Sequence, residues 1–278
     1  MNNQRLKPFL RWAGGKNWLI KDLINYIPSS INDYHEPFLG GGSVFFHLQP
    51  RNHSYLSDRN EELINAFVQV RDNVEEVISI LKTYSNTNDD YYKIRSRVYP
   101  DKISKAAQFI YLNRTSFNGI YRVNLKGIYN VPYGFKKYKN LFEYDLIRNA
   151  SLALKSTNLK TCDFEENVNL IKVGDFVFID PPYTMSHIKN GFIKYNEKLF
   201  SWKDQERLSN FIKIIKSNGA FYFLTNAKHR SVKKLYGDID LPFTINRYSI
   251  VGGKNAKRGL IQEYIFTNVK NGYRKYTI

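Results

Sequence analysis

The sequence predicts an α/β fold with a mostly parallel sheet, and three observations support that prediction. Segments with strand character alternate with helical segments in the first part of the chain and again from Asn158 onward, as in parallel sheets connected by helices. A run of glycines, residues 40–42, lies between a predicted strand and a predicted helix. Two predicted strands end on an aspartate, Asp58 and Asp180, at the edge of the sheet where such folds bind ligands.

The elements of the N-terminal part follow from the spacing of apolar residues. Residues 18–27 have helical spacing and are closed by Pro28, and residues 61–84 are strongly helical. Between these helices, residues 33–48 predict a short strand, a glycine turn and a helix. Residues 53–60 predict a second strand, which ends on an acid.

The middle of the chain is predicted to be an insertion, residues 86–150, between two parts of the sheet domain. It begins with two helical segments separated by Pro100. Residues 117–134 then mix glycine, asparagine, tyrosine and β-branched residues, which is typical of a hairpin with an ordered loop. The sheet domain would therefore comprise residues 1–85 and 151–278.

Strands return in the C-terminal part, and helices fall between the middle ones. One such helix is predicted at residues 201–219. The predicted strands are residues 159–164, 175–183, 219–226 and 259–268.

Composition and charge indicate a globular protein with a polyanionic partner. Of the 278 residues, 42% are hydrophobic and 15% aromatic, enough for a sizeable core. The chain has 42 Lys and Arg against 25 Asp and Glu, a net charge of +17, which favours nucleic acid as a partner. Solubility, or the lysine bias of an AT-rich genome, is the alternative explanation. A single cysteine, no signal peptide and no membrane span predict a cytoplasmic protein without a membrane partner.

The glycine run suits a ligand that approaches the backbone closely. Asp58 lies 18 residues after Gly40, near the spacing at which such folds place an acid on ribose hydroxyls. Glu36 precedes the glycines, where a carboxylate suits an ammonium group and repels pyrophosphate. We therefore expect a nucleoside ligand, with a purely structural turn as the alternative.

A second glycine-containing loop, residues 9–19, carries Trp12 and Lys16. The loop could close on a ligand carboxylate, with the ammonium group of Lys16 nearby. The alternative is a core tryptophan beside a solvated lysine.

The main candidate for chemistry is the sequence Asp-Pro-Pro-Tyr, residues 180–183, at the end of a predicted buried strand. Pro181 and Pro182 have no N–H, so the Asp180 carboxylate and the neighbouring carbonyl groups are fixed acceptors for a ring-bound –NH₂ group. Tyr183 offers a face on which a planar base can stack. Such acceptors stabilise positive charge that develops on the nitrogen as it attacks a sulfonium methyl group. A strand-terminating turn is the alternative.

Taken in order along the chain, these motifs resemble one family. The segments "FLRWAGGK", "EPFLGGGSVFF", "FNGIYRVNLKGIYNVPYG", "CDF" and "DPPY" follow one another as in the Dam-type DNA adenine-N6 methyltransferases of the D12 class, alpha group. The resemblance extends from about Phe9 to Asn268. It implies an α/β, Rossmann-like S-adenosylmethionine-dependent methyltransferase sheet with an inserted DNA-recognition domain, residues 86–150, built from helices and a β-hairpin.

The resemblance also implies which residues bind S-adenosyl-L-methionine, whose product is S-adenosyl-L-homocysteine. In this family the strand-end acid holds the ribose, and the "CDF" segment suggests that Asp163 binds the adenine amine. The expected catalytic residues, which hold the flipped target adenine, are Asp180, Pro181, Pro182 and Tyr183. The expected cofactor-binding residues are Trp12, Lys16, Glu36, Phe38, Gly40, Gly42, Asp58, Asp163, Phe164 and Asp180. No metal ligand is expected.

For the DNA, the resemblance implies that residues 117–134 read the sequence. Arg122 matches an arginine that binds guanine, and Pro132 matches a proline that touches a thymine methyl group. Asn118 and Tyr121 lie near the residue that relatives insert into the base stack. Arg11 stands where many members have a guanine-reading lysine. The expected DNA-binding residues are Arg11, Asn118, Tyr121, Arg122, Asn124 and Pro132, and the expected site is GATC or another site that contains GAT.

The expected partner is double-stranded DNA, from which the target adenine must be flipped out. Residues 247–259, in which glycines lie between four basic residues, are predicted to form a hairpin loop on the DNA face, or otherwise a solvated loop. The protein is expected to be monomeric or weakly dimeric and to be encoded by a bacterium or a phage.

The sequence leaves four alternative functions. An RNA methyltransferase that modifies an exocyclic amine, as in ribosomal RNA, can share the Asp-Pro-Pro motif but usually lacks the hairpin segment. A DNA-binding protein without catalysis is disfavoured by Lys16, Asp58 and Asp180. A dinucleotide-dependent oxidoreductase is disfavoured by Glu36 and the missing G-x-G-x-x-G. A cytosine-N4 methyltransferase usually has serine in place of Asp180.

Overall fold

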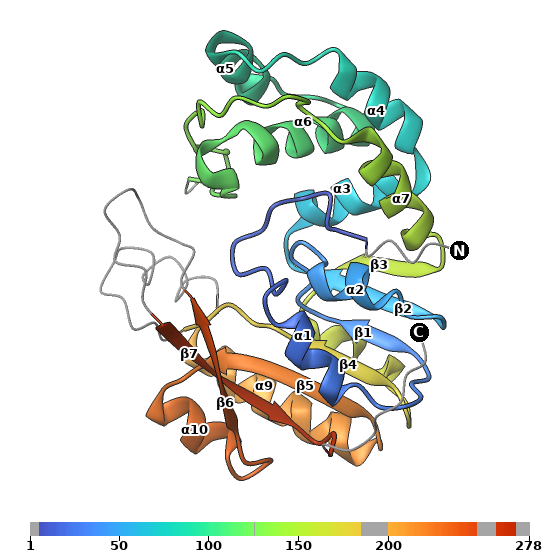
Figure 1. Ribbon diagram of the computed structural model, residues 1–278, viewed down its shortest axis with the longest axis vertical. Helices are drawn as coiled ribbons and strands as arrows, with labels where there is room; N and C mark the ends of the chain where they lie inside the picture. Colours follow the sequence, from blue (N-terminus) through green and yellow to red (C-terminus); the bar gives the residue numbers. More distant parts are fainter. Residues whose placement is uncertain (1–5, 125, 185–199, 249–259, 271–278) are drawn as a thin grey trace. The chain divides into compact units, whose positions relative to one another are not determined.

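The structure, a computed structural model, describes residues 6–124, 126–184, 200–248 and 260–270 of the chain (Figure 1). The chain divides into two compact units. Unit 1 comprises Met1–Asn17 and Leu39–Cys162, and unit 2 comprises Trp18–Phe38 and Asp163–Ile278.

Among the described residues, seven strands form one sheet in the order β3-β2-β1-β4-β5-β7-β6. The pairs β2–β3, β1–β4 and β4–β5 are parallel, whereas β7 is antiparallel to β5 and to β6. The predicted α/β fold with a mostly parallel sheet is therefore confirmed. The strands are β1 (Tyr34–Glu36), β2 (Ser54–Asp58), β3 (Thr157–Thr161), β4 (Phe176–Ile179), β5 (Phe221–Ala227), β6 (Phe243–Tyr248) and β7 (Leu260–Thr267).

The core of unit 2 forms between its strands and the long helix α9 (Trp202–Ser217). The four residues of β4 are all buried, and Val177 and Ile179 join side chains of β5 and of the apolar face of α9 in one cluster. Ser201 and Asp204 begin α9 with a reciprocal capping box. Gly219, at φ +74°, then turns the chain into β5. The other helices of unit 2 are α1 (Ile20–Leu23), η1 (Ile24–Tyr26), η3 (Phe164–Leu170) and α10 (Arg230–Tyr236).

Unit 1 is largely helical, and α6 (Lys102–Thr115) is buried along most of its length, where it packs on α3 and α4. Its N-terminus is capped by Asp101, whose carboxylate accepts from the Ser104 N–H at 2.7 Å. The other helices of unit 1 are α2 (Ser43–Leu48), α3 (Glu61–Asp72), α4 (Val74–Lys82), α5 (Asn88–Ser96), η2 (Phe117–Gly119) and α7 (Tyr144–Leu154).

The helix predicted at residues 61–84 is two helices, because it breaks at Asn73. Asn73 leaves helical geometry, with φ −132° and ψ 43°. Its side-chain amide donates to Gln69 Oε1 at 2.7 Å, and asparagine has a low helix propensity. The sequence analysis also did not predict α7, α10 and β6.

Residues 116–134 form a bridged loop rather than a regular two-stranded hairpin. Antiparallel bridges join Ser116 to Tyr133 and Val123 to Tyr129. Asn124 organises the turn, because its Oδ1 accepts from the N–H groups of Lys126 and Ile128 at 2.9 and 3.0 Å. These side-chain bonds add to backbone bonds across the loop, from the Asn124 N–H to the Ile128 carbonyl at 2.9 Å and from the Asn130 N–H to the Arg122 carbonyl at 3.1 Å.

Of the basic loop predicted at residues 247–259, residues 249–259 lie outside the described residues. The described chain ends at Tyr248 and begins again at Leu260, which pair as the last residue of β6 and the first of β7. No helix in the described ranges is long and apolar enough to cross a membrane.

Candidate active site

The end of β4 carries the residues that the sequence predicts to be catalytic. After four buried residues the chain reaches Asp180, which is partly buried, and then Pro181 and Pro182. Because β5 is the parallel neighbour of β4, Thr225 lies beside Asp180, and its hydroxyl donates to Asp180 Oδ1 at 2.5 Å. One oxygen of the carboxylate is thus oriented by a side chain of the neighbouring strand.

The ring of Tyr183 is held at its hydroxyl end. The hydroxyl donates to Oε2 of Glu263, a buried residue of β7, at 2.7 Å. Nε of Arg247, on β6, donates to Oε1 of the same carboxylate at 2.5 Å. Burial, followed by the negative charges of Glu263 and Asp180, raises the pKa of Tyr183 well above its ordinary value. The phenol therefore stays protonated and remains a donor at neutral pH.

Glu36 ends β1 as a buried carboxylate. It accepts from the Tyr34 hydroxyl at 2.8 Å, and burial together with this negative charge raises the pKa of Tyr34. Because β1 and β4 are parallel neighbours, Glu36 and Asp180 stand at the same edge of the sheet. Two residues after Glu36, the ring of Phe38 stacks on that of Phe164, with centroids 5.3 Å apart.

Asp163 is bound by an arginine of α9. Its Oδ1 accepts from the Glu165 N–H at 3.2 Å, as the cap of η3, and from Nη2 of Arg207 at 2.6 Å. Arg207 also donates to Glu165 at 2.6 Å and to Asp204 at 2.9 Å. Its guanidinium lies 4.9 Å from the ring centre of Phe164. Phe164 is only 1% exposed, so its ring is part of the core of unit 2.

In unit 1, Asp58 holds the glycine loop. The N–H groups of Gly40 and Asn60 donate to its two carboxylate oxygens, each at 3.0 Å. Burial raises the pKa of Asp58, although these backbone hydrogen bonds lower it. Gly40 has φ +49°, and a Cβ atom there would lie 2.7 Å from Cδ1 of Trp12. Gly42 also has a positive φ, +67°, so neither position readily accepts a side chain.

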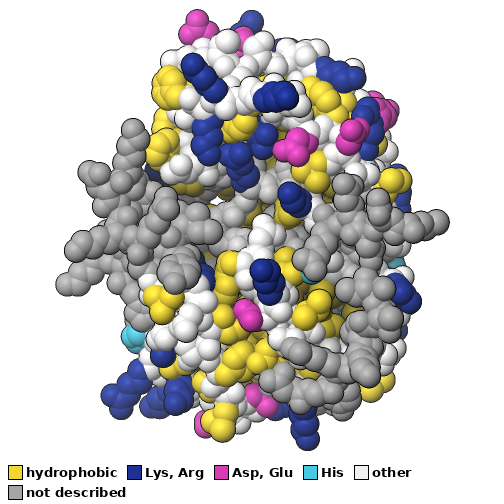
Figure 2. Space-filling model, in the orientation of Figure 1, with side chains coloured by type: hydrophobic (Ala, Val, Ile, Leu, Met, Phe, Trp, Pro, Cys, Tyr) yellow, Lys and Arg dark blue, Asp and Glu magenta, His cyan; other side chains and the backbone are white. Residues whose placement is uncertain are grey.

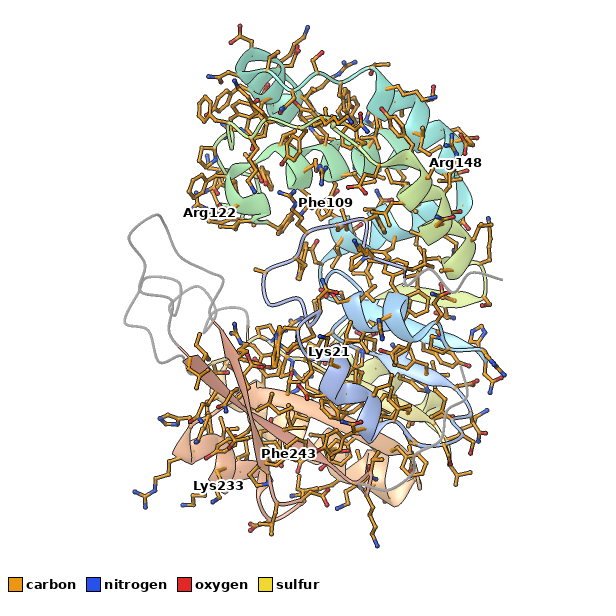
Figure 3. All side chains as sticks on the ribbon, in the orientation of Figure 1. Lys21, Phe109, Arg122, Arg148, Lys233 and Phe243 are labelled. Carbon is orange, nitrogen blue, oxygen red and sulfur yellow. The ribbon has the colours of Figure 1, made fainter. Side chains whose placement is uncertain are left out.

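The loop that carries Trp12 and Lys16 packs on the rest of unit 1. The Trp12 indole stacks on Tyr121, with centroids 5.8 Å apart, and on Phe109 of α6, labelled in Figure 3, with centroids 6.4 Å apart. Lys16 is 4% exposed, and its Nζ donates to the Gly14 carbonyl at 3.2 Å. The solvated lysine that the sequence left as an alternative is therefore wrong.

Arg11 lies in a cluster of cations. Its N–H donates to the side chain of Asn113 at 2.8 Å, and the same side chain donates back to the Arg11 carbonyl at 2.7 Å. Arg11 Nη1 donates to the Tyr138 hydroxyl at 3.3 Å. Burial, followed by the charges of Arg11 and Arg114, lowers the pKa of Lys136. Such a cluster favours an anionic partner, and Lys and Arg side chains are visible over the helices of unit 1 in Figure 2.

Arg122 is an exposed residue of the bridged loop (Figure 3). Its Nε donates to Asn130 Oδ1 at 2.8 Å, so the guanidinium is held from the opposite side of the loop. Asn118 is exposed and has φ +56°. The carbonyl of Pro132 accepts from the Phe117 N–H at 2.9 Å.

The structure thus collects the predicted site residues in two groups, one in each unit. Trp12 touches both the glycine loop and Tyr121, and it therefore joins predicted cofactor residues to a predicted DNA residue within unit 1. Unit 1 holds Trp12, Lys16, Gly40, Gly42 and Asp58, together with Arg11, Asn118, Tyr121, Arg122, Asn124 and Pro132. Unit 2 holds Glu36, Phe38, Asp163, Phe164, Asp180, Pro181, Pro182 and Tyr183.

Sequence reasoning missed Thr225, Glu263 and Arg207, because tertiary structure brings them to Asp180, Tyr183 and Asp163. It counted Arg247 among the basic residues of a loop on the DNA face, whereas the structure places it on β6 with its guanidinium on Glu263. Glu263 had one local signal, since it is the single acid of the largely apolar strand "LIQEYIFT". Acids are rarely buried unless they are paired. Arg207 lies three residues after Asp204 on α9, a spacing that predicts only a helical ion pair.

The mostly parallel sheet, the glycine loop held by an aspartate and the Asp-Pro-Pro-Tyr corner define a Rossmann-like methyltransferase. Residues 12–250 match the family model for D12 class N6 adenine-specific DNA methyltransferases, and the chain belongs to that family. It is therefore an adenine-specific DNA methyltransferase, as the sequence predicted.

Curated relatives are similar to this chain over nearly its whole length. The Type II methyltransferase M1.LlaDCHI of Lactococcus lactis is 36% identical and covers 97% of this chain and 98% of its own length. The Type II methyltransferase M.MjaIII of Methanocaldococcus jannaschii is 34% identical, with 95% and 99% covered. The DNA adenine methylase of Haemophilus influenzae is 30% identical, with 94% and 88% covered.

Proposed function

We propose that the protein transfers the methyl group of S-adenosyl-L-methionine to N6 of an adenine that is flipped out of double-stranded DNA, and releases S-adenosyl-L-homocysteine. The observation that carries the proposal is the corner after β4. There Thr225 orients the Asp180 carboxylate, two prolines without N–H follow, and Tyr183 is anchored at its hydroxyl. Such a corner accepts hydrogen bonds, and the N6 amine of adenine has two to donate.

The charged residues of the two units match the chemistry of S-adenosyl-L-methionine, which supplies an electrophilic methyl group on a sulfonium when bound. Lys16 suits its carboxylate, Glu36 suits its ammonium group, and Asp163 suits its adenine amine. Asp58 suits the ribose hydroxyls, because a carboxylate has about four lone-pair sites and can accept further hydrogen bonds beside those from Gly40 and Asn60.

In the proposed reaction Asp180 acts on the amine of the target base. Its carboxylate and the carbonyl of Pro181 accept the two N6 hydrogens and stabilise the positive charge that develops on nitrogen. An N–C bond forms as the C–S bond breaks, and the electron pair of that bond stays on sulfur. Asp180 then accepts the proton that N6 loses and passes it to solvent, so the carboxylate is ready for another turnover.

Residues 86–150 are proposed to be the target-recognition domain, with the bridged loop as its reading element. Arg122, held by Asn130, would bind guanine O6 and N7, and Pro132 would contact a thymine methyl group. Tyr121 stacks on Trp12, so the neighbouring Phe117, which is 50% exposed, suits insertion into the base stack better. Arg11 would contact a guanine beside the target, and the proposed site is GATC or a longer site that contains GAT.

The DNA partner is supported by charge as well as by the corner. A net charge of +17 attracts the negatively charged phosphates of DNA. The proposed enzyme works as a monomer or a weak dimer. Binding should weaken steeply with added salt, because each phosphate contact releases counterions.

The test is transfer of a labelled methyl group from S-adenosyl-L-methionine to defined duplexes, followed by nucleoside analysis. Label on N6-methyladenine in a duplex that contains GATC, and none in one that contains GTTC, would support the proposal. Label in ribosomal RNA but not in DNA, or on cytosine, would overturn it.

Sequence reading by Arg122 is tested separately. Arg122→Ala should lose about 1–3 kcal/mol of discrimination at one base pair of the site, measured as the ratio of kcat/KM between matched and mismatched duplexes. Arg148→Ala, at a half-buried arginine of α7 that pairs with Glu75 (Figure 3), is the control and should keep the ratio. An equal loss on all duplexes would make Arg122 a phosphate contact instead.

A further inference from the structure

A row of three linked polar side chains crosses unit 2 behind the Asp-Pro-Pro-Tyr corner. The Tyr183 hydroxyl donates to Oε2 of Glu263 at 2.7 Å, and Nε of Arg247 donates to Oε1 at 2.5 Å. Both oxygens of the carboxylate are therefore engaged, one by the tyrosine and one by the arginine. The proposed reaction uses only the first member of this row.

The sheet fixes the row in place. Arg247 pairs with Ile261 across β6 and β7, and Glu263 lies two residues further along β7, so Arg247 and Glu263 are diagonal neighbours on one face of the sheet. The guanidinium of Arg247 also lies 5.8 Å from the ring centre of Trp18. The carboxylate is therefore carried by a strand that is paired on both sides, with β5 and with β6, rather than by a loop.

Burial of the Glu263 carboxylate costs free energy that the stability of the fold does not require. The Glu263 side chain is 1% exposed and that of Arg247 is 23% exposed. Burying a carboxylate is unfavourable, and an ion pair seldom does more than offset that cost. An apolar residue at position 263 would serve the fold at least as well, so stability alone does not explain an acid there.

The hydrogen bond from the Tyr183 hydroxyl to Glu263 gives a functional reason for an acid at this position. A tyrosine side chain has two rotatable bonds, and a fixed partner at the hydroxyl end restricts the first of them, because it holds the hydroxyl oxygen and therefore the long axis of the ring in place. Because burial and the nearby negative charges keep the phenol protonated, the donor persists across neutral pH. The direction of the ring axis is then set by Glu263 before any base arrives.

We propose that Glu263 is a positioning residue for methyl transfer, which fixes the ring of Tyr183 so that it can stack on the flipped adenine, and that Arg247 supplies the charge that lets this carboxylate remain buried. This role rests on the proposed function. It assigns to β6 and β7, the two antiparallel strands, a part in catalysis that the parallel strands alone do not provide.

The test is a double-mutant cycle with Tyr183→Phe and Glu263→Ala on the full-length protein. Each single change should lower kcat about tenfold, because each leaves one buried polar group without its partner, and the KM for S-adenosyl-L-methionine should stay unchanged. The double variant should be no slower than the slower single variant, since both changes remove the same hydrogen bond. Losses that multiply, or a Glu263→Ala variant with wild-type kcat, would overturn the role.

Two further variants keep the test independent of folding. Glu263→Gln retains the size but has one oxygen for two donors, so its kcat should also fall, whereas Glu206→Ala, at an exposed acid of α9, should keep wild-type kcat. If Glu263→Ala does not fold, the cycle is measured with Glu263→Gln. Losses that multiply in that cycle would equally overturn the role.

A spectroscopic measurement separates positioning from plain structure. In a duplex with 2-aminopurine in place of the target adenine, wild-type protein should flip the base and stack it on Tyr183, which quenches part of its fluorescence. Glu263→Ala should raise the emission of the flipped base, and unchanged emission would overturn the role. A wild-type protein that transfers no methyl group to DNA would instead overturn the proposed function itself.

Discussion

Two aspartates end parallel strands in this protein, one in each unit, and their surroundings differ. Asp58, the last residue of β2 in unit 1, accepts hydrogen bonds from the backbone N–H groups of Gly40 and Asn60. Asp180, which follows β4 in unit 2, accepts from the hydroxyl of Thr225, and the next two residues are prolines without an N–H. Asp58 therefore holds a loop through backbone bonds, whereas one oxygen of Asp180 is held by a side chain of the neighbouring strand.

The comparison shows that two acids at equivalent strand ends can have different hydrogen-bond partners, and that the backbone next to each acid decides which partners it has. Backbone N–H groups that donate to a carboxylate give it a structural role, because the carboxylate then holds the conformation of that backbone. Prolines withhold those donors. Four predictions, from the largest expected effect to the smallest, test this contrast.

The largest effect is expected for Asp180→Asn. The amide presents two donors where the amine of adenine needs acceptors, so kcat should fall by about 10²–10³. Methyl transfer at saturating substrate measures this loss, and urea unfolding should show little change in stability. Asp89→Asn, at an exposed residue of α5, is the matched control. Undiminished turnover of Asp180→Asn would show that the Asp180 carboxylate has no role in catalysis, and the proposed difference between Asp180 and Asp58 would then be wrong.

A large effect on stability is expected for Gly40→Ala, in the loop that Asp58 holds. The new Cβ atom would lie 2.7 Å from the Trp12 ring, at a backbone φ of +49°, so the free energy of unfolding should fall by about 2–4 kcal/mol. Gly127→Ala is the control, since φ is +75° there but nothing lies within 4 Å. Equal losses in urea unfolding of the two variants would show that the Trp12 contact does not matter.

A smaller effect is expected for Thr225→Val, which removes the hydroxyl that orients Asp180 and keeps the shape of the side chain. A loss of one hydrogen bond to a charged group, about 1.5 kcal/mol, corresponds to about a tenfold lower kcat. Thr244→Val, at an exposed residue of β6, should leave kcat unchanged. If both variants behave alike, Thr225 does not orient the carboxylate.

The smallest effect is the pH dependence that Asp58 gives to stability. Its pKa is raised in the folded protein, mainly by burial, so the folded state binds the proton more tightly than the unfolded state. Its contribution to stability is therefore greatest below the ordinary value of 3.8 and declines as pH rises through the folded pKa. Asp58→Asn cannot titrate, so the stability of the wild type relative to this variant should decline as pH rises above about 4. An increase over this range, measured by urea unfolding, would show that the backbone hydrogen bonds outweigh burial.

The sequence predicted elements best where local chemistry defines them. Glycines after β1, the acids that end β2 and follow β4, and the break at Pro100 all lie where the structure has them. It missed the helix break at Asn73. It predicted a hairpin with an ordered loop at residues 117–134, which antiparallel bridges join, but not that the side chain of Asn124 holds the turn. In both places the backbone geometry depends on how a few polar side chains bond, which periodicity does not record.

The sequence by itself determined the alternation of strands and helices, the order of the motifs and, through them, the family of the protein. Tertiary structure alone decided that Asp180 meets Thr225 and that Tyr183 meets Glu263. Thr225 lies 45 residues from Asp180 in the chain, and Glu263 lies 80 residues from Tyr183. The physical reason is that propensity and spacing act over a few neighbouring residues, whereas these hydrogen bonds form only when the register of β4, β5, β6 and β7 brings distant residues together.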